Sequence, residues 1–344
     1  MSEPMWFNNG FGQMFDVLAF SWLGTPLWMW LAFLGIVIVL LVLDLGVLHR
    51  KHHEIGVRES LLMSAFYITI GVAFGGFVWW HIGPVAGMNY LTGFAVEKAL
   101  AMDNVFVIAM IFSFFAVPRL YQHRVLFWGI LGVIILRALM IGFGTAVISQ
   151  FSWVLYLFAA FLVATGVKML VFADAEYDIA RNPVIGMMRR RFNVTDEHHD
   201  QHFFVKKPHP TTGEPAWFMT PLFMALVLIE IADVIFAVDS VPAIFAITTD
   251  PFIVYTSNIF AILGLRALYF ALAAMVHRFH YLKYALAFVL IFIGSKIFVA
   301  DMLDLAKIPA PVSLGATFAI LAAGVGWSLW KTRGEKPEVE QVTG

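Results

Sequence analysis

Long apolar stretches separated by short polar connections dominate the pattern of this chain. Several of them exceed about 18 residues, the length that a helix needs to cross a bilayer. The pattern predicts nine transmembrane helices, at residues 27–48, 60–80, 92–116, 125–148, 152–172, 220–247, 254–276, 282–300 and 312–330. We therefore expect an all-α, polytopic membrane protein. A β-barrel is excluded, because its strands would alternate apolar and polar side chains.

Basic residues between the predicted helices indicate the orientation. Nearly all of them fall after the first, third, fifth and seventh helices or in the tail, whereas the opposite side carries only Lys307. Since cytoplasmic loops are rich in Lys and Arg, the N-terminus is expected outside and the C-terminus in the cytoplasm. The chain is expected to contain two groups of three helices, which are described in the next paragraph. The other expected parts are an arm at 1–26, peripheral helices at 27–90, a cytoplasmic loop at 173–219, a last helix at 301–330 and a tail at 331–344.

Two groups of three predicted helices, residues 91–172 and 220–300, repeat one order of charged residues. Each group has two acids six residues apart, a following Asn or Ser, an Arg in the second helix and a Lys in the third. The members are Glu97, Asp103, Asn104, Arg137 and Lys168 in the first group, and Asp233, Asp239, Ser240, Arg266 and Lys296 in the second. Three helices reverse the direction of crossing, so this is an inverted repeat. Such repeats are typical of secondary transporters, with the site where the copies meet.

Charged residues inside the membrane cost roughly 2.5–3.5 kcal/mol each, so they indicate a functional site. Asp103 and Asp239 are the first candidates for metal ligands, because they are equivalent in the two copies and each precedes a side-chain oxygen, on Asn104 or Ser240. Pro242 has no N–H, which leaves the carbonyl of Val238 without its helical partner and available to a cation at a broken helix.

The acids Glu97 and Asp233 are less simply placed. On a straight helix, six residues turn about 600°, so each acid lies about 120° away from its partner Asp. They converge on one ion only if the helix unwinds between the two acids; otherwise they form an outer shell or a proton site. Glu230 has Phe94 as its counterpart and is a candidate access carboxylate, and Asp44 is a candidate to join the site from the cytoplasmic side.

The intramembrane bases are expected to balance these acids. Arg137, Arg266, Lys168 and Lys296 occur once per helix and can neutralise the acids of the third and sixth helices as ion pairs.

Oxygen ligands without thiolate or intramembrane His favour a hard divalent cation, Mg²⁺, Ca²⁺ or Mn²⁺. Met102 could add a thioether that prefers Mn²⁺, although a Met in an apolar helix usually only packs. Acids left by a divalent cation would repel one another, so exchange of metal for protons is the expected mechanism. The run from Asp196 to His202 could collect metal, but a solvated loop is the simpler interpretation.

Other classes of function find little support. The chain has no Cys, which excludes thiol chemistry, and its net charge of −1 gives no indication of a nucleic-acid partner. No cofactor is expected. An intramembrane aspartyl protease would need Gly-x-Gly-Asp, but Gly142-Phe143-Gly144 is followed by Thr145. We therefore expect no enzymatic activity.

The segments from Glu97 to Asn104 and from Asp233 to Ala243 closely resemble the signature motifs of the TerC family. The resemblance covers roughly residues 27–330. It implies export of Mn²⁺ from the cytoplasm across the bacterial inner membrane, with Glu97, Asp103, Asp233 and Asp239 as the important acids. Two alternatives stay open: an assembly factor that acts in complexes with other membrane proteins and transports nothing, and a transporter of Ca²⁺ or another ion.

Overall fold

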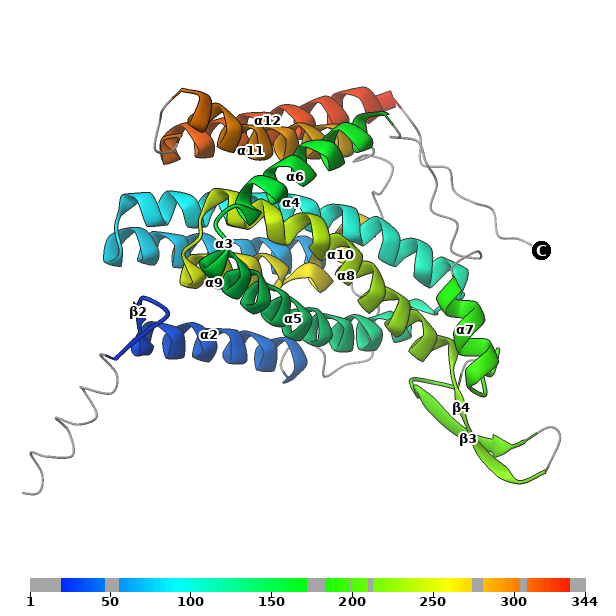
Figure 1. Cartoon of the computed structure of the whole chain (residues 1–344). Helices are drawn as coiled ribbons and strands as arrows, with labels where there is room; N and C mark the ends of the chain where they lie inside the picture. Colours follow the sequence, from blue (N-terminus) through cyan, green and yellow to red (C-terminus); the bar gives the residue numbers. More distant parts are fainter. Residues whose placement is uncertain are drawn as a thin grey trace, which may run out of the picture.

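The structure is a computed structural model that describes residues 20–46, 56–171, 183–197, 199–209, 213–273, 281–303 and 308–334. The side chains of residues 45, 46, 57, 103 and 273 lie outside the description. The chain is a bundle of long helices with a small hairpin at one end (Figure 1). Most of the expected arm, 1–26, and the tail beyond residue 334 also fall outside the described residues.

Each predicted span is occupied by helix. The helices are α2 (Leu27–Gly46), α3 (Val57–His81), α4 (Pro84–Phe114), α5 (Arg119–Gln150), α6 (Val154–Val171), α8 (Pro221–Ile247), α9 (Pro251–Ile262) with α10 (Leu265–Ala273), α11 (Leu282–Met302) and α12 (Ala310–Lys331). Within the described residues, eight helical segments are long and apolar enough to cross a membrane. The remaining one, α4, is 31 residues long and carries Glu97, Lys98 and Asp103. An integral membrane bundle is thus confirmed.

Local sequence explains several helix starts. Pro84, Pro221 and Pro251 each occupy the first turn of a helix, where the missing N–H costs nothing. Asp250 caps α9 by accepting hydrogen bonds from the backbone N–H of Phe252 at 2.9 Å and of Ile253 at 3.3 Å.

The remaining elements are short. Two-stranded antiparallel ribbons form from β1 (Ser21–Trp22) with β2 (Thr25–Pro26), and from β3 (Phe204–Pro208) with β4 (Pro215–Met219). A short helix, α7 (Pro183–Arg191), precedes the second ribbon, and the 3₁₀ turn η3 (Thr332–Gly334) follows α12. The α7 helix, the β3–β4 ribbon and the end of α12 lie at the same end of the bundle, where the predicted orientation places the cytoplasm (Figure 1).

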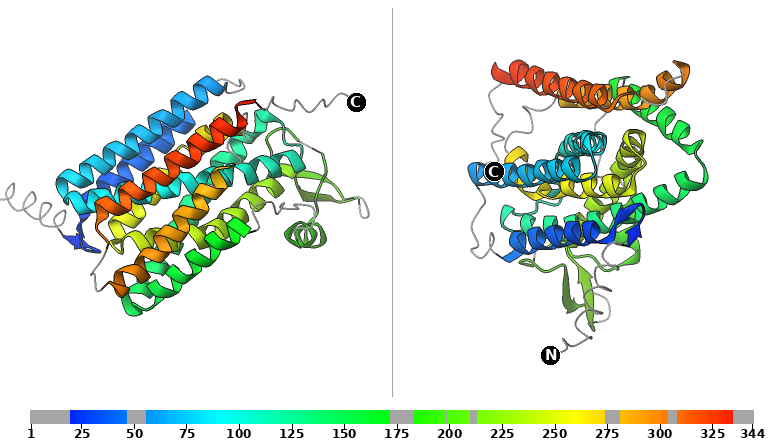
Figure 2. Two further views of the ribbon diagram at one scale, coloured as in Figure 1. Left: turned by 90° about the horizontal axis from the view of Figure 1, so that it is seen from above. Right: turned by 90° about the vertical axis from the view of Figure 1, so that its left-hand side faces the viewer.

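The helices are arranged in layers. Helices α11 and α12 cover one side of the molecule and α2 covers the opposite side, with α4, α8 and α9 between them (Figure 2). Helix α4 packs against α8 and α9, and α8 packs against α4, α5 and α6. The two third helices of the predicted repeat, α6 and α11, pack against each other. Elements from both repeat copies therefore form the centre of the bundle.

The packing of two equivalent glycines, each against the backbone of the other helix, supports the repeat. A Cβ on Gly166 of α6 would lie 2.7 Å from the carbonyl oxygen of Ala287 on α11. A Cβ on Gly294 of α11 would lie 2.6 Å from the carbonyl oxygen of Ala159 on α6. Each helix thus approaches the other at the same repeat position, as two copies related by a pseudo-twofold axis would.

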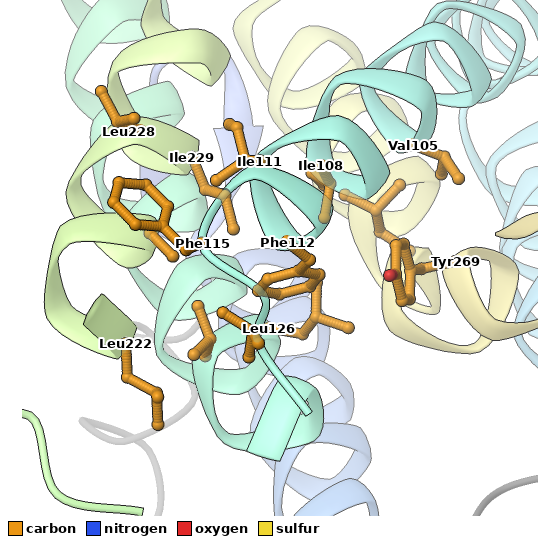
Figure 3. Close-up of a cluster of buried hydrophobic side chains, with 14 of the residues drawn as sticks. Val105, Ile108, Ile111, Phe112, Phe115, Leu126, Leu222, Leu228, Ile229 and Tyr269 are labelled. Atoms are coloured by element: carbon orange, nitrogen blue, oxygen red, sulfur yellow. The ribbon is translucent and has the colours of Figure 1, made fainter. Parts of the chain in front are cut away.

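An apolar layer closes the end of the bundle near α7. Side chains from α4, α5, α8 and α10 gather there, including Ile111, Phe112, Leu126, Leu222 and Tyr269 (Figure 3). The one polar tip among these five, the Tyr269 hydroxyl, donates to Gln122 Oε1 at 3.1 Å. This layer separates the centre of the molecule from the predicted cytoplasmic side.

Candidate ion-binding site

Arg137 of α5 is the centre of a buried polar cluster. Its side chain is 1% exposed, and its guanidinium group donates to four other side chains. Nη1 contacts Glu97 Oε1, Ser240 Oγ at 2.7 Å and Asn258 Oδ1 at 3.3 Å. Nε and Nη2 contact the two carboxylate oxygens of Asp233, at 3.3 and 3.0 Å. Five oxygen atoms therefore surround one cation.

The two acids come from equivalent positions of the two repeat copies. Glu97 lies on α4 and Asp233 on α8, and both form ion pairs with Arg137. Asn104 and Ser240, also equivalent, flank the cluster: Ser240 accepts from Arg137, and Asn104 Nδ2 donates to Asp233 Oδ1 at 3.4 Å. The pseudo-twofold axis therefore passes close to the guanidinium group.

Arginine suits this position better than lysine would. Its planar guanidinium carries five N–H donors in a fixed arrangement and stays protonated, so it can bind two carboxylates and two neutral oxygens at once. With both acids ionised, the cluster has a net charge of −1. Removing one member of such a buried ion pair leaves an uncompensated charge and is strongly destabilising.

Asn104 has an unused hydrogen-bonding atom beside this cluster. The residue is 6% exposed, yet its Oδ1 has no hydrogen-bond partner among the described residues. Asn104 and Asp233 line a small cavity of about 20 Å³, with Gly129, Val133 and other apolar residues around it. The cavity is mostly apolar, and its size corresponds to about one water molecule, for which Asn104 Oδ1 is a hydrogen-bond acceptor. The cavity lies toward the first halves of α5 and α8, on the side of the apolar layer.

Glu230 lies one turn before Asp233 on α8. Its carboxylate fills the space where a side chain on Gly132 of α5 would be, and its Oε2 is buried without a hydrogen-bond partner in the described structure. The predicted role of Glu230 as an access carboxylate stays a prediction. Its position, on the cavity side of the cluster, is compatible with that role.

The helix break that was predicted at Pro242 is wrong. Helix α8 continues through Pro242 to Ile247, so Val238 is part of a continuous helix, and its side chain lies on the outer surface. Because the helix does not unwind, Asp233 and Asp239 lie about 120° apart on it. Asp239 is absent from the Arg137 cluster and instead accepts a hydrogen bond from Thr165 of α6 at 3.2 Å.

The real discontinuity lies between α9 and α10, in the seventh predicted span. Leu263 ends α9, and Gly264 has φ +82°, a backbone conformation that favours glycine. Lys98 of α4 donates to the carbonyl oxygens of Ala261 at 3.0 Å and Leu263 at 3.4 Å. The buried ammonium thereby satisfies carbonyl groups that the break leaves without helical partners.

Arg266 has a described partner outside the predicted repeat, and its pairing with the acids of the third and sixth predicted helices stays a prediction because the Asp103 side chain lies outside the described part of the chain. It forms an ion pair with Asp44 of α2, with Nη2 2.5 Å from Oδ1, and also donates to the Asp44 carbonyl at 3.0 Å. Since Arg137 already compensates Glu97 and Asp233, Arg266 takes its partner from outside the repeat. Asp44 therefore lies in a separate ion pair rather than in the cluster.

The two lysines of the repeat also lie outside the cluster. Lys168 is close enough to Asp239 to act on its charge. Lys296 donates to Ser313 Oγ of α12 at 3.3 Å and lines a cavity of about 380 Å³ together with Asn89, Thr248 and Asp301. This cavity lies at the end of the bundle opposite α7.

Within the described residues, no three His, Cys, Asp or Glu side chains are placed to hold a metal ion. Arg137 stands between Glu97 and Asp233, and Asp239 lies on another face of α8. The predicted convergence of Asp103 and Asp239 stays a prediction, because the Asp103 side chain lies outside the described part of the chain.

The polar loop uses its acids in ion pairs. Asp196 accepts from Arg189 at 3.0 Å, and Glu197 accepts from Lys207 at 2.6 Å, which lowers the pKa of the Glu197 carboxyl. Both pairs are exposed, so each contributes little to stability. The possible metal-collecting role of the run from Asp196 to His202 remains untested, and His198 lies outside the described residues.

Asn258 is the cluster member that sequence reasoning missed. It donates to Glu97 Oε2 at 3.2 Å as well as accepting from Arg137, and it is fully buried. A signal was available in the sequence: Thr256, Ser257 and Asn258 form a polar run inside an apolar span. The hydroxyls of Thr256 and Ser257 bond to carbonyls of their own helix, whereas Asn258 reaches the cluster.

Comparison with known proteins identifies the group to which this arrangement belongs. Residues 82–336 match the model described as "Integral membrane protein TerC family". The chain belongs to the TerC family. Among TerC relatives, a protein of Escherichia coli O6:H1 described as "Putative membrane-bound redox modulator Alx" is 44% identical over 327 residues, covering 92% of this chain and 99% of its own.

Two further TerC relatives carry no described function. An "Uncharacterized membrane protein" of Rickettsia bellii is 48% identical, covering 86% of this chain and 95% of its own. "Uncharacterized membrane protein STKORF319" of Myxococcus xanthus is 45% identical, covering 91% and 95%. No solved structure matches the chain.

Proposed function

We propose that this TerC protein exports a divalent metal cation, Mn²⁺ in particular, across the bacterial inner membrane in exchange for protons. The observation that carries the proposal is the cluster of five oxygen atoms at the meeting point of the two repeat copies. Two of the residues that supply these oxygen atoms, Glu97 and Asp233, are acids. A third, Ser240, occupies the position in the second copy that Asn104 occupies in the first. Carboxylate, amide and hydroxyl oxygens are the ligands that Mg²⁺, Ca²⁺ and Mn²⁺ prefer.

The coupling of metal transport to protons is expected from the negative charges of the site. When a divalent cation leaves two carboxylates in a site with little water, their mutual repulsion favours binding of a proton. The larger cavity beside Lys296 supports access from the end of the bundle opposite α7, whereas the apolar layer closes the other end in this structure. Outward direction, bacterial inner-membrane location and preference for Mn²⁺ over Ca²⁺ rest on the family resemblance.

The description of the Alx relatives as redox modulators suggests a redox role. This chain has no Cys, so a redox function could not use a dithiol or a disulfide here. Metal transport needs no such group, and for this reason we favour it.

Flux measurements on purified protein in liposomes test the proposal. With Mn²⁺ on one side and dyes for Mn²⁺ and pH inside, the native protein should move Mn²⁺ with an opposing proton flux. Glu97→Gln and Asp233→Asn should each reduce this flux at least tenfold, whereas Asp196→Asn, which removes an exposed loop acid, should not.

Mn²⁺ movement without proton movement would contradict the exchange, and faster movement of Ca²⁺ would change the cargo. Absence of any flux from folded protein would contradict transport and favour the assembly-factor alternative.

A further inference from the structure

Five oxygen atoms of the central cluster that could bind a metal cation already contact the guanidinium group of Arg137. The five contacts of Arg137 include Glu97 Oε1, both carboxylate oxygens of Asp233, Ser240 Oγ and Asn258 Oδ1. A metal ion and the guanidinium group cannot bind these atoms together, because they would occupy the same space and carry charge of the same sign.

The charges of the cluster also indicate an exchange of cations. With Arg137 in place, the two carboxylates and the guanidinium sum to −1. Without it, they sum to −2, which a divalent cation neutralises. Asn104 Nδ2 contacts Asp233, so rotation of this buried amide would turn its unpaired Oδ1 toward the site. The oxygen ligands would then number six, as in the octahedral oxygen sites of Mg²⁺ and Mn²⁺.

We propose that Arg137 is a built-in competitor of the transported metal: it binds the site oxygens in the metal-free protein and withdraws when the divalent cation binds. This inference rests on the proposed function and adds its regulation. A tethered cation offsets one of the two negative charges of the empty site, and a proton offsets the other, so the metal-free protein can change conformation with little repulsion between Glu97 and Asp233. It also speeds release, because Arg137 replaces the departing metal.

The structure offers a place for the displaced side chain. A helical side chain leans toward the N-terminus of its helix, so Arg137 can turn toward Val133, where the cavity beside Asn104 has to widen beyond its present space for about one water molecule. One turn before Asp233 on α8, the buried Oε2 of Glu230 has no hydrogen-bond partner in the described part of the chain. Glu230 would accept the guanidinium group while metal occupies the site.

Equilibrium binding of Mn²⁺ to the purified full-length protein tests the inference. Arg137→Gln removes the competitor and keeps a polar side chain of moderate length, so it should bind Mn²⁺ at least tenfold more tightly than the native protein. Arg266→Gln is the matched control, because Arg266 is the repeat-equivalent arginine but pairs with Asp44. Its Mn²⁺ affinity should stay within about twofold of native.

Unchanged or weaker binding by Arg137→Gln would overturn the inference. If the native protein transports Mn²⁺ in liposomes and Arg137→Gln binds no more tightly, this inference alone fails. If the native protein neither binds nor transports Mn²⁺, the proposed function fails with it.

A second pair of variants keeps the test decisive if Arg137→Gln does not fold. Arg137→Lys keeps the charge, but an ammonium has three donors and cannot contact all five oxygens, so Mn²⁺ should bind several-fold more tightly than in native protein. Glu230→Gln should weaken binding in the native background by removing the second partner of Arg137. Its effect should be smaller in the Arg137→Lys background, where the weaker competitor depends less on a second partner, since interacting residues are non-additive. Equal effects of Glu230→Gln in all backgrounds would contradict the displacement.

Discussion

Arg137 shows how a buried charge can be both structural and functional at the scale of one residue. It compensates two acids in the metal-free protein, and it occupies the position that the proposed cargo needs. Removal of one partner from a buried ion pair typically costs about 3–5 kcal/mol, because the remaining charge has neither water nor a counter-ion.

The first prediction concerns stability without metal. Arg137→Gln should lower the free energy of unfolding by about 3–5 kcal/mol in metal-free detergent solution. Adding Glu97→Gln and Asp233→Asn to the same chain should recover most of this loss, because no buried charge then remains unpaired. Thermal unfolding of the purified variants measures both effects. Additive losses in the triple variant would show that Arg137 acts independently of these two acids.

The sequence predicted which charged residues lie in the membrane, but it predicted their ion-pair and hydrogen-bond partners less well. Charge balance gave the pairing of Arg137 with acids on the third and sixth predicted helices. It did not indicate Asp44 as a partner of Arg266, because periodicity contains no information about the depth of Asp44 relative to a helix 222 residues away. Asn258 was missed because a neutral amide adds nothing to a charge count.

At the scale of elements, the continuity of helices decides which residues can meet. Helix α8 tolerates Pro242, so its two acids stay on different faces, whereas α9 ends before Gly264. The sequence could locate both the proline and the glycine. It could not show which one interrupts a helix, because that depends on tertiary partners such as Lys98, which satisfies the carbonyls at the actual break.

The second prediction concerns the contact between α6 and α11. Gly166→Leu and Gly294→Leu should each destabilise the protein by about 1–3 kcal/mol or more, because the new side chain overlaps backbone of the other helix. Gly315→Leu on α12 is the control, since nothing lies within 4 Å of its Cβ position. Thermal unfolding in detergent compares the three variants. Equal stability of all three would mean that the two helices can separate without cost.

At the scale of the whole molecule, the repeat could be predicted from the sequence because charged residues recur in the same order in the two groups of helices. The structure adds reciprocal packing, because Gly166 and Gly294 each lie against the backbone of the other helix. The equivalent acids Glu97 and Asp233 both pair with Arg137. The short helix and ribbon within the loop 173–219 were not anticipated, since polar sequence with scattered Pro and Gly gives no clear period.

The third prediction concerns orientation, for which the absence of Cys is an experimental advantage. Ser152→Cys, between α5 and α6, should react with a membrane-impermeant maleimide in intact cells. Lys206→Cys, in β3, should react only after the membrane is opened. Both side chains are exposed, so burial would not limit labelling. The reverse pattern would invert the predicted topology.

The ion pair between Asp44 and Arg266 has a consequence for biosynthesis. The two residues are 222 positions apart, so at 5–20 residues per second the ribosome needs roughly 10–45 s to produce Arg266 after Asp44. During that interval the first helix carries an acid with no guanidinium to receive it. Because Asp44 lies near the end of α2, its carboxylate can stay at the membrane surface, and we expect α2 to reach its final packing only after the seventh span is made.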